Sequence, residues 1–409
     1  MISIRLPLLV ALLFGWTSGC AIAEPNPSYA LEYALTLERD GIVDVTLTVT
    51  QDNGALRRLK LLTSGEGVRD LSAAAKRTAA GERVWTVPPA GGAIRWKSAL
   101  PTSADDDSVR ALVTDTWAVF RVEDVLPRIA SVSVRGADAA TKMQINLPDD
   151  WSIATAYAGS GGSFVVEDQA RRFDRPDGWI VAGDIGVRRD LIGSTQVAVA
   201  APREQNARRL DVMAFLSWHL PLVQSQFSNF PDRLLVAMAD DPFFRGGLSA
   251  PNSLFLHADR PLISGNGTST LLHELFHVGL SRSAGPESDW IVEGLAEFYS
   301  QQWLFEAGTV TEKRHAATLR QLKDWGNDAS SLRTDRSSGA VTALAVSIFA
   351  SLDNEIRRET DDARLSDVVK VLARDAGPLT LTALRDAATT VLGKPAVSLQ
   401  SSRLPGYDS

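Results

Sequence analysis

The sequence predicts an α+β protein, with an N-terminal β-sandwich followed by a mixed domain and a helical C-terminal lobe. From residue 29 to 202, apolar residues recur at every second position in short runs, which is typical of strands with one buried face. Beyond residue 202 the apolar spacing becomes helical. The chain has 409 residues, 44% of them hydrophobic, so each part is long enough to bury its own core.

Residues 1–23 are predicted to be a secretory signal peptide. They carry one charged residue, Arg5, then the apolar run 6–16 and small residues that end in Ala21-Ile22-Ala23. This order matches a signal peptide that is cleaved after Ala23, and the apolar run is too short to span a bilayer. We therefore expect export across the inner membrane and a periplasmic mature protein.

Cys20, the only cysteine, leaves an alternative open. It follows Gly19 and other small residues, so the segment also fits a lipoprotein signal that anchors the chain through Cys20. Contact with a membrane is expected only in that case. Cleavage after Ala23 removes the cysteine instead, and the mature chain then depends on its core without a disulfide.

Residues 24–202 are predicted to form the β-rich N-terminal domain. Alternating apolar residues at 31–37 and 43–49 flank Asp40-Gly41, which predicts a hairpin with a tight turn. Gly, Pro, Asp and Asn separate the further runs, as expected between strands. These further strands are expected at 83–87, 111–120, 131–134, 142–147, 163–166, 179–182 and 196–200.

Residues 203–310 are predicted to form the catalytic domain, and residues 311–409 the helical C-terminal lobe with a short tail. In the first segment we expect two helices that Ser or Thr can cap, one beginning near Thr268 or Ser269 and one after Ser288 or Asp289. The other elements expected there are a helix at 208–227 and strands at 233–239 and 253–256. Helices of the lobe are expected at 312–324, 340–358, 366–374 and 381–392.

The run His273-Glu274-Leu275-Phe276-His277 predicts a metal site. Two histidines four positions apart lie about 40° apart around a helix, so both imidazoles can bind one small cation. Glu293, in a following helix, is placed to be the third protein ligand, which leaves a fourth position for water. This pattern predicts one catalytic zinc ion per chain, with Glu274 as the general base that accepts a proton from the attacking water.

Two other interpretations stay open. An accidental match would be two core histidines beside a solvated glutamate, although the chain has only five histidines. A fold that has kept its ligands and lost its chemistry would be a catalytically inactive peptide-binding or scaffold protein of the cell envelope. Such a scaffold has no need for the carboxylate of Glu274.

The charge of the chain bears on its partners. Forty-two basic residues stand against 49 acidic ones, a net charge of −7, and no basic run occurs. Nucleic acid is therefore not expected as a partner. A peptide or protein substrate is expected instead.

The motif His-Glu-x-x-His followed by Trp-x-x-Glu-Gly-x-Ala-Glu resembles the gluzincin zinc metallopeptidases, especially the glycyl aminopeptidase family and more distantly the aminopeptidase N family. The resemblance spans roughly residues 30–375, with its strong motifs in 246–298. It implies a β-sandwich followed by a thermolysin-like zinc peptidase domain. It also implies zinc ligands His273, His277 and Glu293, with Glu274 as base and Glu297 orienting a ligand histidine.

Two departures from the family pattern concern the substrate. Ser249 stands where the family's Gly-Gly-Leu-Glu motif has a glutamate that helps hold a free amino terminus, so aminopeptidase and endopeptidase action both stay open. Arg336, three residues before Gly339, stands where relatives have the tyrosine that stabilises the oxyanion. Arg336 or His315 could donate to that oxyanion instead. The plainer alternatives are a loop arginine and a histidine on a helix surface.

Overall fold

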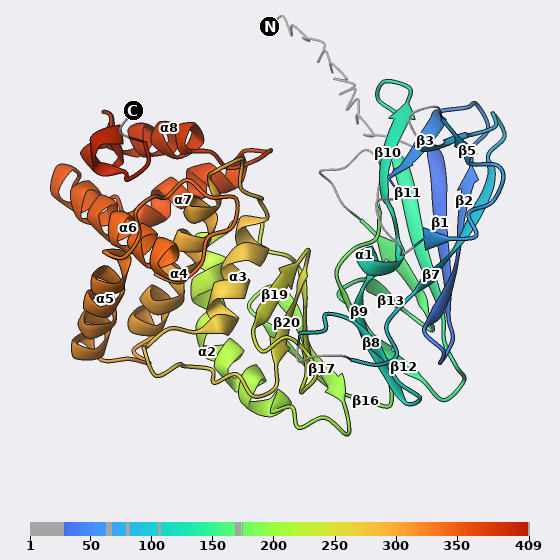
Figure 1. The fold of residues 1–409 in the computed structure, drawn as a ribbon, viewed down its shortest axis with the longest axis horizontal. Coiled ribbons are helices and arrows are strands. Elements are labelled where there is room, and N and C mark those ends of the chain that lie inside the picture. The colour runs from blue at the N-terminus through green and yellow to red at the C-terminus, as the bar shows by residue number, and fades with distance from the viewer. Residues whose placement is uncertain are drawn as a thin grey trace, which may run out of the picture.

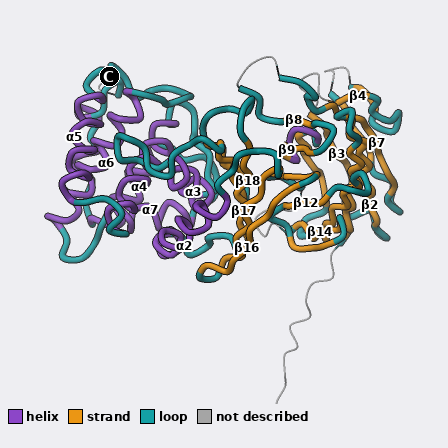
Figure 2. The backbone as a smooth tube through the Cα atoms, turned by 90° about the horizontal axis from the view of Figure 1, so that it is seen from below, coloured by secondary structure: helices purple, strands orange, loops and turns teal. Residues whose placement is uncertain are grey.

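The computed structural model describes residues 28–62, 68–78, 82–104, 108–167, 173 and 175–407. The predicted signal peptide and Cys20 lie outside the described residues. Strands gather at one end of the molecule and helices at the other, which Figures 1 and 2 show from two directions. The predicted α+β class is confirmed.

The first sheet is built around the predicted hairpin. Strands β1 (Tyr29–Leu37) and β2 (Ile42–Thr50) pair antiparallel, and the Asp40 carboxylate accepts a hydrogen bond from the Ile42 N–H at 2.9 Å in the turn. Side chains of β1 alternate between buried and more exposed positions, as the period of two requires. The sheet order is β13 (Ala158–Ser160), β14 (Ser163–Val166), β11 (Ala139–Asn146), β1, β2, β7 (Gly92–Ala99) and β4 (Val68–Arg69).

Two four-stranded sheets share a hydrophobic core with the first sheet. One has the order β10 (Arg128–Ser133), β3 (Leu56–Leu62), β6 (Arg83–Thr86) and β5 (Lys76–Arg77). The other has the order β12 (Ser152–Ala154), β15 (Trp179–Gly183), β9 (Trp117–Arg121) and β8 (Leu112–Val113), and the short helix α1 (Val122–Val125) follows β9. Every residue of β15 is buried, because both faces of this strand are covered. Ile180 faces the shared core, whereas Trp179 and Val181 contact another sheet.

The sheet that Trp179 and Val181 contact is the fourth one and has five strands. Its order is β16 (Ile185–Ile192), β17 (Thr195–Pro202), β18 (Arg233–Ala239), β20 (Ser253–His257) and β19 (Gly247–Ala250). The expected boundary at residue 202 assigned β17 to the N-terminal domain, but β17 pairs with β18 and buries Val197 and Val199 among the helices. A period of two reveals a strand but not the sheet that it joins.

Seven helices occupy the C-terminal half of the described chain, and their bounds agree with the predicted ones to within a few residues. They are α2 (Arg209–Gln226), α3 (Thr270–Leu280), α4 (Asp289–Glu306), α5 (Glu312–Gly326), α6 (Ala340–Glu359), α7 (Leu365–Arg374) and α8 (Leu381–Leu392). Helices α2 and α3 contact the five-stranded sheet, and α4 packs between α3 and α6. The tail contains two short 3-10 helices, Val397–Leu399 and Ser401–Arg403. In the described part of the chain, no helix is long and apolar enough to cross a membrane.

We predict that Gly294→Ala destabilises the fold, although alanine favours a helix over glycine by about 1 kcal/mol. Gly294 lies where α4 meets α6, and a Cβ there would sit 2.4 Å from the Ala345 Cβ and 2.9 Å from a Phe349 ring atom. Forcing a methyl group into such a contact costs about 1–3 kcal/mol. Urea unfolding should show a lower midpoint than the wild-type protein. A higher midpoint would mean that α4 and α6 are less closely packed than the structure shows.

Candidate metal centre

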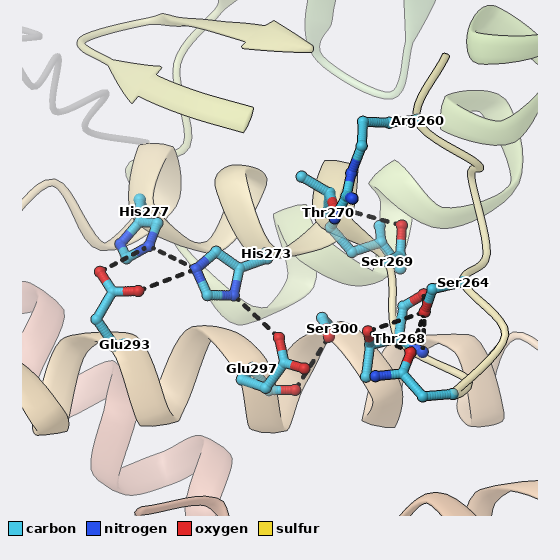
Figure 3. A network of polar contacts seen from close by, with 12 residues as sticks. Arg260, Ser264, Thr268, Ser269, Thr270, His273, His277, Glu293, Glu297 and Ser300 are labelled. Atoms are coloured by element: carbon cyan, nitrogen blue, oxygen red, sulfur yellow. Dashed lines mark hydrogen bonds and ion pairs between the residues drawn. The ribbon is translucent and has the colours of Figure 1, made fainter. Parts of the chain in front are cut away.

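The predicted ligands lie on two packed helices. Helix α3 begins after Ser269, whose hydroxyl accepts a hydrogen bond from the Leu272 N–H at 3.4 Å. This start puts His273 and His277 one turn apart on the same face of α3. Figure 3 shows both imidazoles pointing toward Glu293 of the neighbouring helix α4, with His273 also facing Glu297.

The three ligand atoms are spaced as a tetrahedral metal ion requires. The Nε2 atoms of His273 and His277 are 3.1 Å apart, and the Glu293 carboxylate lies 3.2 Å from the first and 3.5 Å from the second. Zinc bonds of about 2.0–2.1 Å in tetrahedral geometry separate ligand atoms by about 3.3 Å. His273, His277 and Glu293 therefore fit a zinc ion without rearrangement.

Glu297 is where the resemblance implies it to be. It lies one turn after Glu293, and its Oε2 is 3.2 Å from the Nδ1 of His273. A carboxylate in that place keeps the proton on Nδ1 and leaves the Nε2 lone pair of His273 for a metal. The sequence spacing alone indicated the helical face, and the structure shows which histidine Glu297 contacts.

The charges in the site are strongly coupled. Burial lowers the pKa of His277 to about 4, helped by the charge of His273, so His277 is neutral at pH 7 and able to bind a metal. Burial also disfavours protonated His273, but hydrogen bonds to Glu293 and Glu297 outweigh it and hold the pKa of His273 well above its usual value. Burial of Glu293 alone would raise its pKa. Its contacts with the two histidines outweigh that effect, so the pKa of Glu293 is lowered.

Glu274 lies against the edge strand β19. Its side chain is buried, which raises its pKa. The hydroxyl and the backbone of Ser249 hydrogen-bond the Glu274 carboxylate. A Cβ on Gly247 would sit 2.5 Å from the Glu274 Cγ, so only glycine allows β19 this close to the base. The sequence analysis did not predict the contacts of Glu274 with Ser249 and Gly247. The adjacent glycines 246 and 247 were the one sequence feature that could have indicated a close approach of β19.

An open cleft of about 1240 Å³ contains the site. His273, Glu274, His277 and Glu293 line its floor together with β19. Residues of β9, α1 and the loop before β15 line the facing wall, so the N-terminal sheets contribute to the cleft. A substrate larger than a single amino acid fits in this volume.

The two candidates for oxyanion stabilisation are placed differently. Arg336 lines the cleft, near Asp289 at the start of α4. His315 does not line the cleft, because its side of α5 faces α4, where its ring stacks on Phe305 with centroids 4.5 Å apart. The expectation for His315 is corrected accordingly: it is a packing residue.

The loop that carries Arg336 is fixed at several points. The Ser337 N–H donates to the Asp289 carboxylate at 2.6 Å, and the Asp335 carboxylate accepts from the Glu287 N–H at 2.8 Å. Tyr407, near the C-terminus, donates its hydroxyl to the Glu287 carbonyl at 2.8 Å. These contacts fix the loop of Arg336 at the start of α4, in the lining of the cleft, and no local sequence pattern indicates them.

A second group of possible ligands, Asp240, Asp241 and His257, does not form a comparable site. The Nδ1 of His257 accepts a hydrogen bond from the Asp259 N–H, so its Nε2 carries the hydrogen and cannot bind a metal. Arg245 already forms an ion pair with Asp241. The cluster is a network of structural polar contacts.

We predict that Glu297→Ala weakens zinc binding without abolishing it, by about 10–100-fold, because His273 keeps its Nε2 but loses the partner that orients its ring. Glu293→Ala, which removes a ligand, should bind zinc far more weakly than Glu297→Ala. Competition with a chromophoric chelator measures both. Equal zinc affinity of Glu297→Ala and the wild-type protein would contradict the role of Glu297.

No family model matches the sequence, and no curated protein matches it. Solved structures do match. An aminopeptidase N family protein from Idiomarina loihiensis shares 18% identity, with 89% of this chain and 72% of that chain covered at a TM-score of 0.64. An M1 zinc metallopeptidase mutant from Deinococcus radiodurans, bound to a Tyr-Ser-Ala substrate, shares 17% identity over 91% of both chains at a TM-score of 0.55.

Legionella pneumophila aminopeptidase A, in complex with aspartic acid, shares 14% identity at a TM-score of 0.55, with 93% of this chain and 50% of that chain covered. At these identities the likeness is one of fold. The resemblance to gluzincin peptidases found in the sequence is confirmed at that level: the chain has the fold of the M1 zinc metallopeptidases.

Proposed function

We propose that this chain is an exported, zinc-dependent peptidase that hydrolyses peptide bonds. The observation that carries the proposal is the convergence of His273, His277 and Glu293 at tetrahedral spacing, with the buried carboxylate of Glu274 beside them in an open cleft. The Deinococcus neighbour was solved with a tripeptide substrate, which supports peptides as the substrate class. Export to the periplasm, or anchoring through Cys20, belongs to this proposal.

The edge strand β19 supports binding of an extended peptide. Among the described residues β19 pairs with no strand other than β20, so it is the edge strand of its sheet. A substrate can pair with that edge as an additional strand. Because Gly247 touches Glu274, a peptide on β19 brings its backbone close to the general base.

A zinc ion bound by His273, His277 and Glu293 would polarise the scissile carbonyl and make the attacking water more acidic. Glu274 takes the proton from that water and then transfers it to the leaving nitrogen. Its burial raises its pKa, which suits a group that must first accept a proton and then donate it. The guanidinium of Arg336, which lines the same cleft, donates to the developing oxyanion.

Ser249 affects the choice between exopeptidase and endopeptidase action. Its hydroxyl is directed at Glu274, and it provides no charge with which to hold a substrate ammonium group. This substitution favours cleavage within a chain over removal of the first residue. It equally favours the second candidate function, a peptide-binding protein without turnover, and activity measurements separate the two.

We predict that Glu274→Gln keeps its zinc and loses turnover by at least roughly a hundredfold, because an amide cannot accept the proton of the attacking water. Glu312→Gln, at the exposed start of α5, serves as a matched control and should retain activity. Quenched fluorescent peptides measure cleavage, and mass spectrometry measures zinc. Turnover of Glu274→Gln near the wild-type rate would remove its role as the base, whereas a zinc-loaded wild type without any turnover would support the inactive candidate.

For Arg336→Ala we predict a decrease in kcat of about 10²–10³-fold with a smaller change in KM, because the donor acts mainly on charge that develops in the transition state. Arg336→Lys should restore part of the rate. His315→Gln should leave kcat unchanged, since His315 packs on Phe305. A rate loss in His315→Gln that matches the loss in Arg336→Ala would reverse the assignment.

A further inference from the structure

The wall of the cleft is rich in arginine. Arg110, Arg121, Arg128 and Arg175 line it on the side of the N-terminal sheets, and Arg282 and Arg336 line it on the side of the helices. The whole chain, in contrast, carries a net charge of −7. The cleft lining also contains six acidic residues, Glu123, Asp124, Asp177, Glu274, Asp289 and Glu293, so its balance of charge is less acidic than that of the whole chain.

Most of these guanidinium groups have no carboxylate partner. Within the described part of the chain, Arg121 alone of the six forms an ion pair, with Asp124 at 3.0 Å. The acids of the same wall are engaged elsewhere: Glu123 accepts from the Gly178 N–H at 2.8 Å, and Asp177 accepts from the Tyr157 hydroxyl at 3.2 Å. These neutral donors do not cancel the charge of the two carboxylates, and what the wall offers a ligand is the guanidinium N–H groups of Arg110, Arg128 and Arg175.

The arginines are also held next to the strand on which a peptide would lie. Arg110 lies 5.8 Å from the ring centroid of Phe244, the residue two positions before Gly246, and the Phe244 N–H donates to the Val109 carbonyl at 3.0 Å. Arg121 lies 5.8 Å from the ring of Trp179, whose Nε1 donates to the Leu248 carbonyl of β19 at 3.0 Å. Aromatic rings thus connect two of the cations to the edge of the cleft floor.

Arg128 and Arg175 extend the wall. Arg128 is exposed at the start of β10, and Arg175 is half-buried with its guanidinium donating to the Pro127 carbonyl at 3.0 Å. A guanidinium fixed in this way keeps further N–H groups for a carboxylate and loses little conformational entropy when it binds one.

We propose that this arginine wall binds carboxylate groups of the peptide substrate, so that the cleft selects acidic peptides. The inference rests on the proposed peptidase function for the identity of the ligand. It agrees with Ser249, which adds no carboxylate of its own to the strand that the arginines face.

Three fluorescent peptides of one length test this in the zinc-loaded Glu274→Gln protein, which binds without cleaving. One has internal glutamates and an amidated C-terminus, one has glutamines and the same amide, and one has glutamines and a free C-terminal carboxylate. We expect a carboxylate-bearing peptide to bind roughly tenfold more tightly than the neutral peptide, with the preference reduced at high salt. Comparing the affinities of the first and third peptides distinguishes binding of a side-chain carboxylate from binding of a terminal carboxylate.

Substitutions of the arginines test whether the arginine wall causes the preference for carboxylate-bearing peptides. Arg110→Gln combined with Arg128→Gln should remove most of it, and both residues are exposed, so the fold should persist. Arg188→Gln, on β16 at the opposite edge of the five-stranded sheet, should leave it unchanged. Equal affinity for the three peptides, no measurable binding of any, or the same preference in the double variant would each overturn the proposal.

Cleavage by the wild-type protein separates this inference from the proposed function. Charge-selective binding without cleavage would remove the peptidase proposal and leave the arginine wall as the ligand-binding surface of a non-catalytic protein. Cleavage of acidic and neutral peptides at equal kcat/KM would support the proposed peptidase function and contradict the proposed role of the arginine wall.

Discussion

The packing of α3 against α4 determines the site, because it collects three carboxylates around two imidazoles in a largely buried place. Glu274, Glu293 and Glu297 all approach His273 or His277 there. Burying ionised carboxylates costs several kcal/mol per group unless a positive charge compensates. A divalent cation between the helices supplies that compensation, and the ligand spacing fits one.

Apolar side chains between α3 and α4 hold the two helices in the position that this charge cluster needs. Phe276, between the two histidines in sequence, stacks on Tyr299 of α4 with ring centroids 5.3 Å apart and also contacts Trp303. The motif therefore has two roles in the structure: its polar residues form the candidate metal site, and its apolar residues fix the distance between the helices. The arginine-rich cleft wall depends in turn on the packing of β15 against β18 and β20.

Helices and ligands could be predicted from the sequence because their signals are local. The capping serine of α3, the helical spacing of His273, His277 and Glu293, and the position of Glu297 all depend on residues a few turns apart. The sheet that receives β17 could not be predicted, since pairing is decided by distant strands. The choice between Arg336 and His315 likewise depends on which face of α5 packs against α4 and on the contacts that hold the loop before α6.

The arginine wall was also outside the reach of sequence reasoning. Its members come from strands and loops far apart in the chain, and no basic run marks them. Their common role appears only when the N-terminal sheets face the five-stranded sheet across the cleft. The proposed selection of a substrate by charge would therefore be a property of the folded chain and not of any local sequence.

The central claim, a zinc ion between α3 and α4, is tested most directly by the metal content of purified residues 24–409 beside the same protein with Glu293→Ala. The account predicts about one zinc ion per wild-type chain and a large loss in the variant. A wild-type protein that takes up no zinc even after reconstitution, or equal zinc in both proteins, would contradict it.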